Sequence, residues 1–413
     1  MRVLYTIGIW FYTFGIRLVA FFGHEKARQM VKGWNQWPGQ VSKLSSDAPT
    51  AWFHAASLGE FEQARPVLEE LRRRHPDYQV FVTFFSPSGY EVRKNYAQAD
   101  AICYLPMDTP RNASRLLDAV KPSVVFFVKY EFWYNYLCML RKRGIPTYIF
   151  STIFRPNQYF FKWYGGWFRR QLKSSFAHLF VQNEESLRLL KGIGIGQCSL
   201  AGDTRFDRVH QIAKASESND VVEKFLQGYD GKVLVGGSTW PPDEEIISHV
   251  RECNNGWFPG RIILAPHVIS EEHLKQIESL FPDSVRYSVL AGMNGSTSKV
   301  LIIDNIGLLS KLYRYADVAY IGGGFGVGIH NILEAVTFGK PVFFGPNYKK
   351  FQEACDIIVR GGGWSIGIAK ELEDELKQLV TAPEVFRKSS QACTDYMSEN
   401  LGSTEKILST IEI

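Results

Sequence analysis

The sequence predicts an α/β protein made of two doubly wound parallel-sheet domains. From residue 51 onward, short and continuously apolar runs alternate with helical patterns. Such runs are typical of parallel strands that are covered by helices on both faces. The alternation pauses after residue 202 and starts again near residue 232. A length of 413 residues and an apolar content of 45% are sufficient for two domains with a core each.

The chain begins with an apolar and aromatic segment at residues 4–22, interrupted only by Arg17. The first forty residues contain five Lys or Arg and one acid, a net charge of +4. A cleaved signal peptide would need a better cleavage site, and a spanning helix would carry Arg17 inside it. An interfacial helix tolerates such an arginine and places aromatic rings at headgroup level. We therefore expect residues 1–35 to associate with a membrane as a surface-lying or short anchoring helix. The alternative is a buried first helix.

Residues 36–205 are expected to form the first domain. Its predicted strands are 52–56, 79–85, 101–105, 123–128, 147–151 and 178–182, and its predicted helices are 61–74, 87–97, 111–119 and 132–143. Residues 203–211 are interpreted as a crossing linker. The second domain, residues 206–413, has predicted strands at 232–238, 261–266, 299–304, 317–322 and 341–345. A helical stretch at 383–411 could pack back on the first domain. Ligands of such folds bind at the carboxyl ends of the strands, so a cleft between the domains is the expected active site.

A glycine loop at 322–328 connects a predicted strand to a helical pattern at 331–336. Five glycines within seven residues exceed what a tight turn needs. Such a loop allows close approach of a bound group and presents it to a helix N-terminus, which favours an anion. Glu334, in the first helical turn, suits a ribose better than a phosphate. A packing turn is the alternative, and His330 beside the loop is either a phosphate contact or structural.

Two acids follow strands of the first domain. Glu60 lies three residues after Ser57, so it is either a general base or one half of a capping box, and spacing alone favours the cap. Glu131 follows the fourth strand, where Lys129 could simply pair with it.

Three loops of the second domain lie on the same predicted rim as the glycine loop. Gly236–Thr239 suits an anion or a plain helix cap, and Pro266–His267 and Ile306–Leu308 each follow a strand.

Residues 159–176 contain eight aromatic residues, four cations and no acid. This composition suits an anionic lipid headgroup or single-stranded nucleic acid, and the apolar N-terminus favours lipid; a solvated basic helix is the alternative. The net charge of +5 is too small to indicate nucleic-acid binding by itself. Six scattered cysteines without a CxxC pair indicate a reducing compartment, and no metal-ligand spacing is present.

Motifs along essentially the whole chain resemble those of the Kdo (3-deoxy-D-manno-octulosonic acid) transferases of lipopolysaccharide synthesis, which have the two-domain GT-B fold. The matching segments are His54–Glu60 (family pattern HAxSxGE), Thr83–Gly89 (TxTxxG), Tyr104–Asp108 (YLPxD), Glu131–Asn135 (ELWPN), Gln182–Glu184 (QSE), Gly202–Asp207 (GNxKFD), and Gly322–Glu334 with Gly339 (GGS…GGHNxLE). Several motifs in one fixed order make this resemblance specific.

The resemblance implies an inverting transfer of Kdo from CMP-Kdo to a lipid A precursor, lipid IVA, without a metal cofactor. It also implies the cytoplasmic face of the inner membrane of a Gram-negative bacterium. It assigns the general base to Glu60, in place of the capping interpretation, and a second important acid to Glu131. The predicted CMP-donor residues are Ser238, Thr239, Pro266, His267, Ile306, Gly307, Leu308, Gly323, Gly324, His330, Asn331, Ile332, Leu333 and Glu334. The predicted acceptor and membrane residues are Ser57, Gly59, Lys162, Arg169 and Arg170.

The chain departs from the family pattern mainly in the predicted donor pocket. His267 stands where the family usually has an arginine, Leu308 where it has a glutamate, and Trp240 where it has a histidine. Lys129–Tyr130 replaces the usual Glu-Thr. Two other functions therefore stay open: a membrane-associated GT-B enzyme with a different nucleotide sugar, such as a UDP donor, and an inactive nucleotide-binding adaptor.

Overall fold

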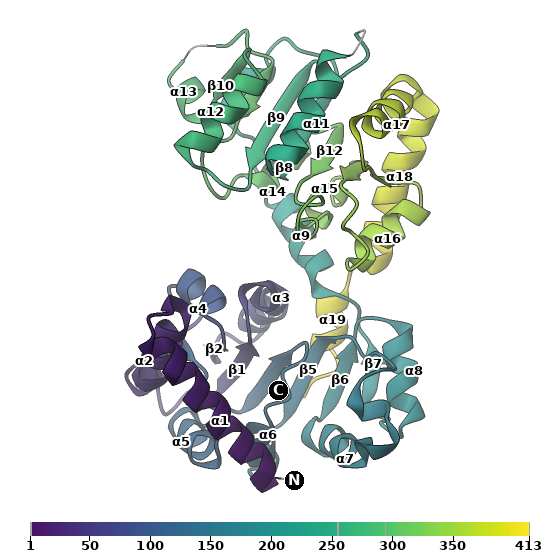
Figure 1. The fold of residues 1–413 in the computed structure, drawn as a ribbon. Coiled ribbons are helices and arrows are strands. Elements are labelled where there is room, and N and C mark those ends of the chain that lie inside the picture. Colours follow the sequence, from purple (N-terminus) through teal and green to yellow (C-terminus); the bar gives the residue numbers. More distant parts are fainter. Residues whose placement is uncertain (1, 254–255, 294, 413) are drawn as a thin grey trace. The chain divides into compact units, whose positions relative to one another are not determined.

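The computed structural model describes residues 2–253, 256–293 and 295–412, and the chain forms two compact units (Figure 1). Unit 1 comprises Met1–Arg208 together with Leu401–Ile413, and unit 2 comprises Val209–Asn400. Each unit contains one seven-stranded sheet in which all pairings are parallel. The predicted α/β class with two doubly wound parallel sheets is confirmed.

In unit 1 the strand order is β3-β2-β1-β4-β5-β6-β7. The strands are β1 (Thr50–Ala55), β2 (Gln79–Phe84), β3 (Ala101–Tyr104), β4 (Val124–Val128), β5 (Thr147–Thr152), β6 (His178–Val181) and β7 (Cys198–Leu200). The helices are α1 (Arg2–Phe21), α2 (Glu25–Val41), α3 (Leu58–Arg74), α4 (Pro87–Arg93), α5 (Pro110–Val120), α6 (Tyr134–Lys142), α7 (Gly166–Ser175), α8 (Glu184–Gly192), α9 (Thr204–Lys214) and α19 (Ser403–Leu408). α9 runs across the boundary between the units.

The sheet of unit 1 is buried on both faces because successive residues of a strand point to opposite sides. Trp52 belongs to a core cluster with residues of α5, α6, α7 and α8. Phe53, the next residue, belongs to a second cluster with residues of α3 and α19. Continuous apolar strands are therefore required here, and an alternating pattern would leave polar groups in one of the two cores.

In unit 2 the strand order is β10-β11-β9-β8-β12-β13-β14. The strands are β8 (Val233–Thr239), β9 (Arg261–Pro266), β10 (Ser284–Arg286), β11 (Val300–Ile302), β12 (Val318–Ile321), β13 (Val342–Phe344) and β14 (Gly363–Ser365). The helices are α10 (Asp220–Leu226), α11 (Pro241–Glu252), α12 (Glu271–Leu280), α13 (Tyr287–Ala291), α14 (Leu309–Leu312), α15 (Leu333–Val336), α16 (Gln352–Val359), α17 (Ala369–Thr381) and α18 (Pro383–Asn400).

Both sheets have a topological switch point, where the chain changes the direction in which it adds strands. In unit 1 this point lies between β1 and β4, and in unit 2 it lies between β8 and β12. Loops on either side of a switch point diverge and leave a crevice at the carboxyl ends of the strands. The order therefore brings the loop with Glu60 beside the loop with Glu131. In the same way it brings Ser238 beside the glycine loop.

The structure corrects several predicted elements. Residues 203–211 do cross from one unit to the other, since the boundary falls between Arg208 and Val209, but most of them lie in the helix α9. The helical stretch 383–411 is broken at Gly402, whose φ of 91° ends one helix and begins another. Asn331 and Ile332 precede the short helix α15, although Glu334 does lie in its first turn. Residues 159–176 form two 3₁₀ turns (Tyr159–Phe161 and Trp163–Gly165) followed by α7. Phe160 and Phe176 are buried, whereas Trp163 is 91% exposed, so this stretch is only partly a solvated basic helix.

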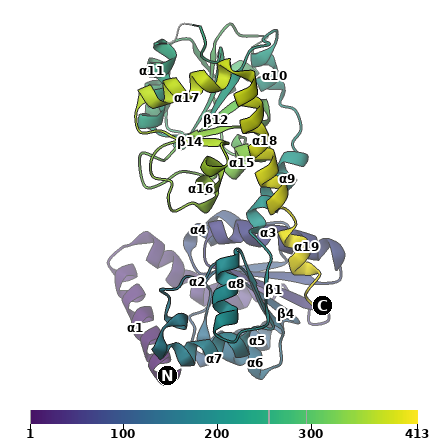
Figure 2. The same ribbon diagram turned by 90° about the vertical axis from the view of Figure 1, so that its right-hand side faces the viewer.

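The C-terminal segment completes unit 1. The carboxylate of Asp207, on α9, accepts hydrogen bonds from the backbone N–H groups of Gly402 (2.7 Å) and Thr404 (2.6 Å) at the start of α19. Ile407 and Leu408 then enter the core cluster that contains Phe53. α19 consequently lies beside α3 (Figure 2).

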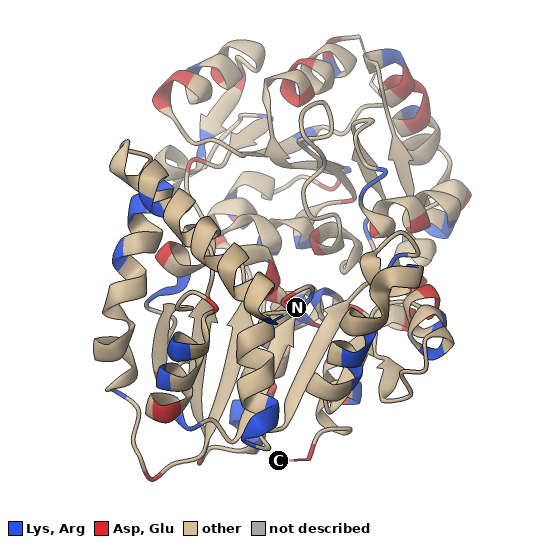
Figure 3. Ribbon diagram, turned by 60° about the horizontal axis from the view of Figure 1, so that its bottom comes forward, with Lys and Arg blue, Asp and Glu red and all other residues tan. Residues whose placement is uncertain are grey.

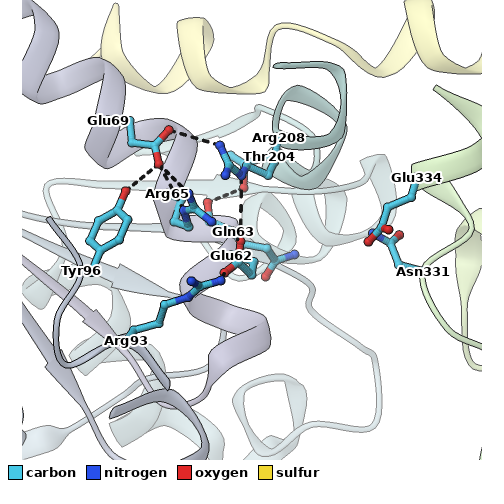
Figure 4. Close-up of polar contacts among 10 residues, drawn as sticks. All are labelled: Glu62, Gln63, Arg65, Glu69, Arg93, Tyr96, Thr204, Arg208, Asn331 and Glu334. Carbon is cyan, nitrogen blue, oxygen red and sulfur yellow. Dashed lines mark hydrogen bonds and ion pairs between the residues drawn. The ribbon is translucent and has the colours of Figure 1, made fainter. Parts of the chain in front are cut away.

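α3 is also fixed to α9 by a charge network on its outer side (Figure 4). Arg208 pairs with Glu69 at 3.2 Å, and Arg65 pairs with the same carboxylate at 3.1 Å. The hydroxyl of Thr204 donates to the backbone oxygen of Gln63 at 2.6 Å. These contacts hold the helix whose first turn contains Glu60.

Candidate active site

Two carboxylates lie at the switch point of unit 1, as the order of strands requires. Glu60 is in the first turn of α3, and its Oε2 accepts the backbone N–H of Ala56 at 2.6 Å. Ser57 is the N-cap residue, but its hydroxyl makes no capping hydrogen bond. The reciprocal capping box that spacing favoured is therefore wrong. The remaining carboxylate oxygen of Glu60 is not used for a cap.

Glu131 is held by a chain of hydrogen bonds that begins in the core. The indole N–H of Trp52 donates to Thr83 Oγ1 at 2.8 Å, and Thr83 Oγ1 lies 2.8 Å from His54 Nδ1. His54 Nδ1 also lies 3.2 Å from the backbone oxygen of Thr83. On the other side of the ring, His54 Nε2 lies 3.0 Å from Glu131 Oε2. The indole N–H of Trp133 donates to the same oxygen.

These hydrogen bonds fix the Glu131 carboxylate beside Glu60. The Glu131 side chain is only 12% exposed, and its Oε2 contacts both His54 and Trp133. Burial and then the charge of Glu131 raise the pKa of Glu60, while the Ala56 amide, Lys129 and His54 act in the opposite direction. A carboxylate with a raised pKa is a better proton acceptor near neutral pH. Two coupled acids of this kind are characteristic of functional sites rather than of helix caps.

Lys129 adds a second indication of function at this position. It follows β4 directly and has a φ of 62°, in the left-handed region that non-glycine residues rarely adopt. Backbone strain of this type costs about 1–3 kcal/mol and clusters at functional sites.

The second group of predicted residues lies at the switch point of unit 2. A Cβ on Gly322 would lie 2.1 Å from the backbone oxygen of Ser238, so only glycine allows this approach of the two loops. Gly323 has a φ of 92°, and Ser238 has a φ of 51°. Gly322 therefore serves the close packing of two loops of the protein, as the packing-turn alternative predicted, and contact of the glycine loop with a bound group stays a prediction.

Three rings form a stack at this edge of the sheet. Trp240 and His267 stack with centroids 4.8 Å apart, and His267 and His330 stack with centroids 4.4 Å apart. The indole N–H of Trp240 also donates to His330 Nε2 at 3.4 Å. Burial and the neighbouring His267 lower the pKa of His330. The two imidazoles, from different loops, could both donate to an anion once protonated.

Asp243 links the loop that follows β8 to the glycine loop. The sequence analysis did not identify this residue as part of the site. Its carboxylate accepts from the backbone N–H of Trp240 (2.9 Å), the backbone N–H of Gly323 (3.0 Å) and the hydroxyl of Tyr320 (3.0 Å). Burial raises its pKa. The sequence did contain a signal: prolines at 241 and 242 followed by an acid at the third helical position indicate a helix start. This signal did not predict the hydrogen bond between Asp243 and Gly323.

The other predicted donor residues differ in what they offer to a ligand. The buried hydroxyl of Thr239 donates to Glu244 at 2.8 Å, which also contacts His273. Ile332, Leu333 and Pro266 are buried, so at these positions only backbone could meet a ligand.

The remaining predicted donor residues are more accessible. Ile306 is 93% exposed, Gly307 has a φ of 95°, and Leu308 precedes α14. Asn331 Nδ2 donates to Glu334 Oε1 at 3.2 Å, and Figure 4 shows these two side chains facing each other. Within the part of the chain that the structure describes, no group of three or more His, Cys, Asp or Glu residues could hold a metal ion.

The predicted acceptor and membrane residues belong to unit 1. Gly59 has open space around its Cα, since an added Cβ would meet no atom within 4 Å. Arg169 donates to the backbone oxygen of Lys162 at 3.4 Å, and Arg170 is exposed on α7. α1 is long and apolar enough to cross a membrane by length and composition alone.

Comparisons with known proteins point to Kdo transferases. A family model described as 3-deoxy-D-manno-octulosonic-acid transferase (kdotransferase) matches residues 32–208. The 3-deoxy-D-manno-octulosonic acid transferase of Aquifex aeolicus is 26% identical over 341 residues, which cover 81% of this chain and 87% of the relative. That of Bordetella pertussis is 25% identical over 428 residues, which cover 97% of this chain and 98% of the relative. The chain is thus similar to Kdo transferases over nearly all of its length.

A solved structure supports the fold. The UDP-GlcNAc 2-epimerase from Neisseria meningitidis, bound to UDP-GlcNAc, matches with a TM-score of 0.61 and 16% identity over 87% of this chain and 99% of that chain. Identity this low shows the fold alone. The fold of this chain is GT-B, as the motifs predicted. Two of its departures from the family pattern, Trp240 and His267, lie together in the ring stack of unit 2.

Proposed function

We propose that this chain transfers Kdo from CMP-Kdo to a lipid A precursor, lipid IVA, with inversion at the sugar and with Glu60 as the general base. The observation that carries the proposal is the environment of Glu60. It is a partly buried carboxyl with a raised pKa, next to the fixed carboxylate Glu131, at the switch point of unit 1. The similarity to Kdo transferases supports the donor and the acceptor.

The proposed reaction is a single displacement. A hydroxyl oxygen of the acceptor forms a bond to the anomeric carbon of Kdo, and the bond from that carbon to the phosphate oxygen of CMP breaks. Glu60 takes the hydroxyl proton, and CMP leaves with the bonding electrons. Glu131 does not exchange a proton in this scheme. Its charge keeps the proton affinity of Glu60 high, and its contacts with His54 and Trp133 keep it in place.

Unit 2 would bind the donor at the ring stack and the glycine loop. His267 and His330 offer two imidazoles where the family usually has an arginine beside proline, so we expect phosphate binding to depend on their protonation. Backbone N–H groups of the glycine loop would add neutral donors to the leaving phosphate. Glu334, held by Asn331, would accept from the ribose hydroxyls.

The acceptor is a lipid, and α1 offers a membrane contact. One side of α1 packs on unit 1, where Tyr5 donates to Asp108 at 2.7 Å and Tyr12 stacks on Phe85. The other side exposes large apolar residues, among them Phe11 (72%) and Phe14 (66%). We propose that α1 lies in the interface at the cytoplasmic face of the inner membrane, because a helix packed along a domain is not free to span a bilayer.

The test is Kdo transfer from CMP-Kdo to lipid IVA in detergent, with EDTA present. Glu60→Gln should lower the rate roughly 10²–10⁴-fold, as expected for loss of a general base. Glu70→Gln is the matched control, because Glu70 lies on the same helix and, among the described residues, pairs with the surface residues Arg73 and Arg74. Wild-type rates in Glu60→Gln would remove Glu60 as the base and leave Glu131 as the next candidate.

A thermal shift with CMP and with UDP tests the donor separately. Stabilisation by CMP alone supports the proposal, and stabilisation by UDP alone supports a different nucleotide sugar as donor. The departures from the family pattern at Trp240, His267 and Leu308 are the reason for this test. Nucleotide binding without transfer by the wild-type protein would support an inactive adaptor.

A further inference from the structure

A groove in unit 1 lies between α1, α2 and the start of α5, apart from the carboxylate pair. Its volume is about 410 Å³. Its walls include Trp10, Phe14 and Arg17 of α1, Trp34 and Trp37 of α2, and Arg115 of α5. In Figure 3, α1 shows no acidic segment along its length, and blue segments of Lys and Arg lie along the adjacent α2. The groove is thus basic and aromatic.

The two arginines of the groove carry positive charge that no acid neutralises. No acidic residue lines the groove. Among the residues that the structure describes, neither Arg17 nor Arg115 forms an ion pair or a hydrogen bond. The guanidinium of Arg115 lies over the ring of Trp37, 5.7 Å from its centroid. A guanidinium that stacks in this way keeps its edge N–H groups available for an anion.

Trp34 forms part of the inner wall of the groove. Its side chain is 8% exposed, and its indole Nε1 is closed to solvent inside the wall. An oxygen acceptor in the groove would therefore meet the two arginine side chains, with the indole rings as the surrounding wall.

The apolar surroundings define the rest of the ligand. Trp10 and Phe14, which form one wall, are 62% and 66% exposed and continue into the exposed apolar side of α1. A ligand that matches the whole surface has a compact anionic head and a long apolar tail. We propose that this groove binds the phosphate headgroup of an anionic membrane phospholipid, whose acyl chains lie along α1. The inference rests on the proposed membrane association, and it does not depend on the transfer chemistry.

Vesicle co-sedimentation of the full chain tests this site. Wild type should bind vesicles of phosphatidylcholine with phosphatidylglycerol more tightly than vesicles of phosphatidylcholine alone. The variant Arg17→Gln/Arg115→Gln should lose roughly tenfold to thirtyfold of the affinity for the anionic vesicles, since each basic residue at a membrane surface contributes about a factor of five. The control Lys26→Gln/Arg111→Gln removes the same charge from exposed positions of α2 and α5 outside the groove, and it should lose clearly less.

The comparison of the two double variants separates a built site from general attraction, because both remove two positive charges and only one of them removes charges from the groove. Equal losses in the two double variants would overturn the proposal. Release of the protein by inorganic phosphate at constant ionic strength would also overturn it, by showing a site for a free anion. Circular dichroism verifies that each variant is folded. Kdo transfer to a detergent-dispersed acceptor should persist in all of these variants. If the proposed function is wrong, the wild-type protein will show no transfer either.

Discussion

Asp108 connects the N-terminal helix to the first turn of α6, and this role makes the stability of unit 1 depend on pH. Its carboxylate is buried and accepts from the hydroxyl of Tyr5 (2.7 Å) and from the backbone N–H groups of Asn135 (3.0 Å) and Tyr136 (2.9 Å). Burial nevertheless raises the pKa of Asp108 to about 6. Replacement by asparagine removes the titration and keeps a carbonyl acceptor, but its amide would place a donor against one of the existing donors.

The size and sign of the effect follow from the pKa. A pKa of about 6 in place of 3.8 corresponds to about 3 kcal/mol, because each tenfold change in proton affinity corresponds to about 1.4 kcal/mol. Since the folded state raises this pKa, the stability from protonated Asp108 is fully present below about pH 4. It is lost as pH rises through about 6. Asp108→Asn should therefore be less stable than wild type at pH 4, and the difference should shrink by about 3 kcal/mol by pH 7.

Urea denaturation of both proteins at a series of pH values, followed by tryptophan fluorescence, measures this difference. The other titrating groups are common to both proteins and cancel. Tyr5→Phe should enlarge the pH dependence, because the Tyr5 hydrogen bond lowers the pKa of Asp108. A difference between wild type and Asp108→Asn that stays constant from pH 4 to pH 7 would refute the reasoning. It would show that the three donors fully compensate the burial.

Two further predictions concern the proposed reaction. Glu131→Gln removes the like charge that raises the pKa of Glu60, so the acid limb of the pH profile of kcat/KM should move to lower pH. An acid limb at the wild-type pH in a folded variant would show that Glu131 does not influence the pKa of the catalytic base. His267→Arg replaces an imidazole by a guanidinium fork, so the affinity for CMP measured by calorimetry at pH 8 should rise about tenfold and should depend less on pH than in wild type. Unchanged affinity and pH dependence would place the phosphate away from the ring stack.

The central strands of both sheets could be predicted because burial on two faces demands continuous apolar residues. Trp52 and Phe53, on opposite faces of one strand, illustrate the demand. The strands β7, β10 and β14 were missed. Each has three residues, lies at the edge of a sheet and is partly exposed, so its sequence has no such pattern.

Sequence reasoning could place individual residues of the candidate site at the ends of predicted strands. It could not identify contacts between residues that are distant in sequence. Glu60 and Glu131 each follow a predicted strand, so both could be placed at the carboxyl edge of the sheet. That β1 and β4 are neighbours, which brings the two acids together, became known only from the structure. The contact of His54 with Glu131 joins residues 77 positions apart, and that of Asp243 with Gly323 joins residues 80 apart. Spacing also could not show that Glu60 reaches the amide of Ala56 rather than completing a cap with Ser57.

The return of α19 to unit 1 affects the order in which a newly made chain can fold. Unit 2 is one uninterrupted segment, Val209–Asn400, inserted in sequence between two parts of unit 1. A ribosome therefore finishes all of unit 2 before it releases Ile407 and Leu408, which fill the face of the first sheet. Until then that face of the sheet lacks two of its core residues, and the Asp207 carboxylate lacks the two backbone N–H donors of the α19 N-terminus. The unit synthesised first is thus completed last. A ribosome that stalls between residues 401 and 408 would leave an apolar surface for chaperones to recognise.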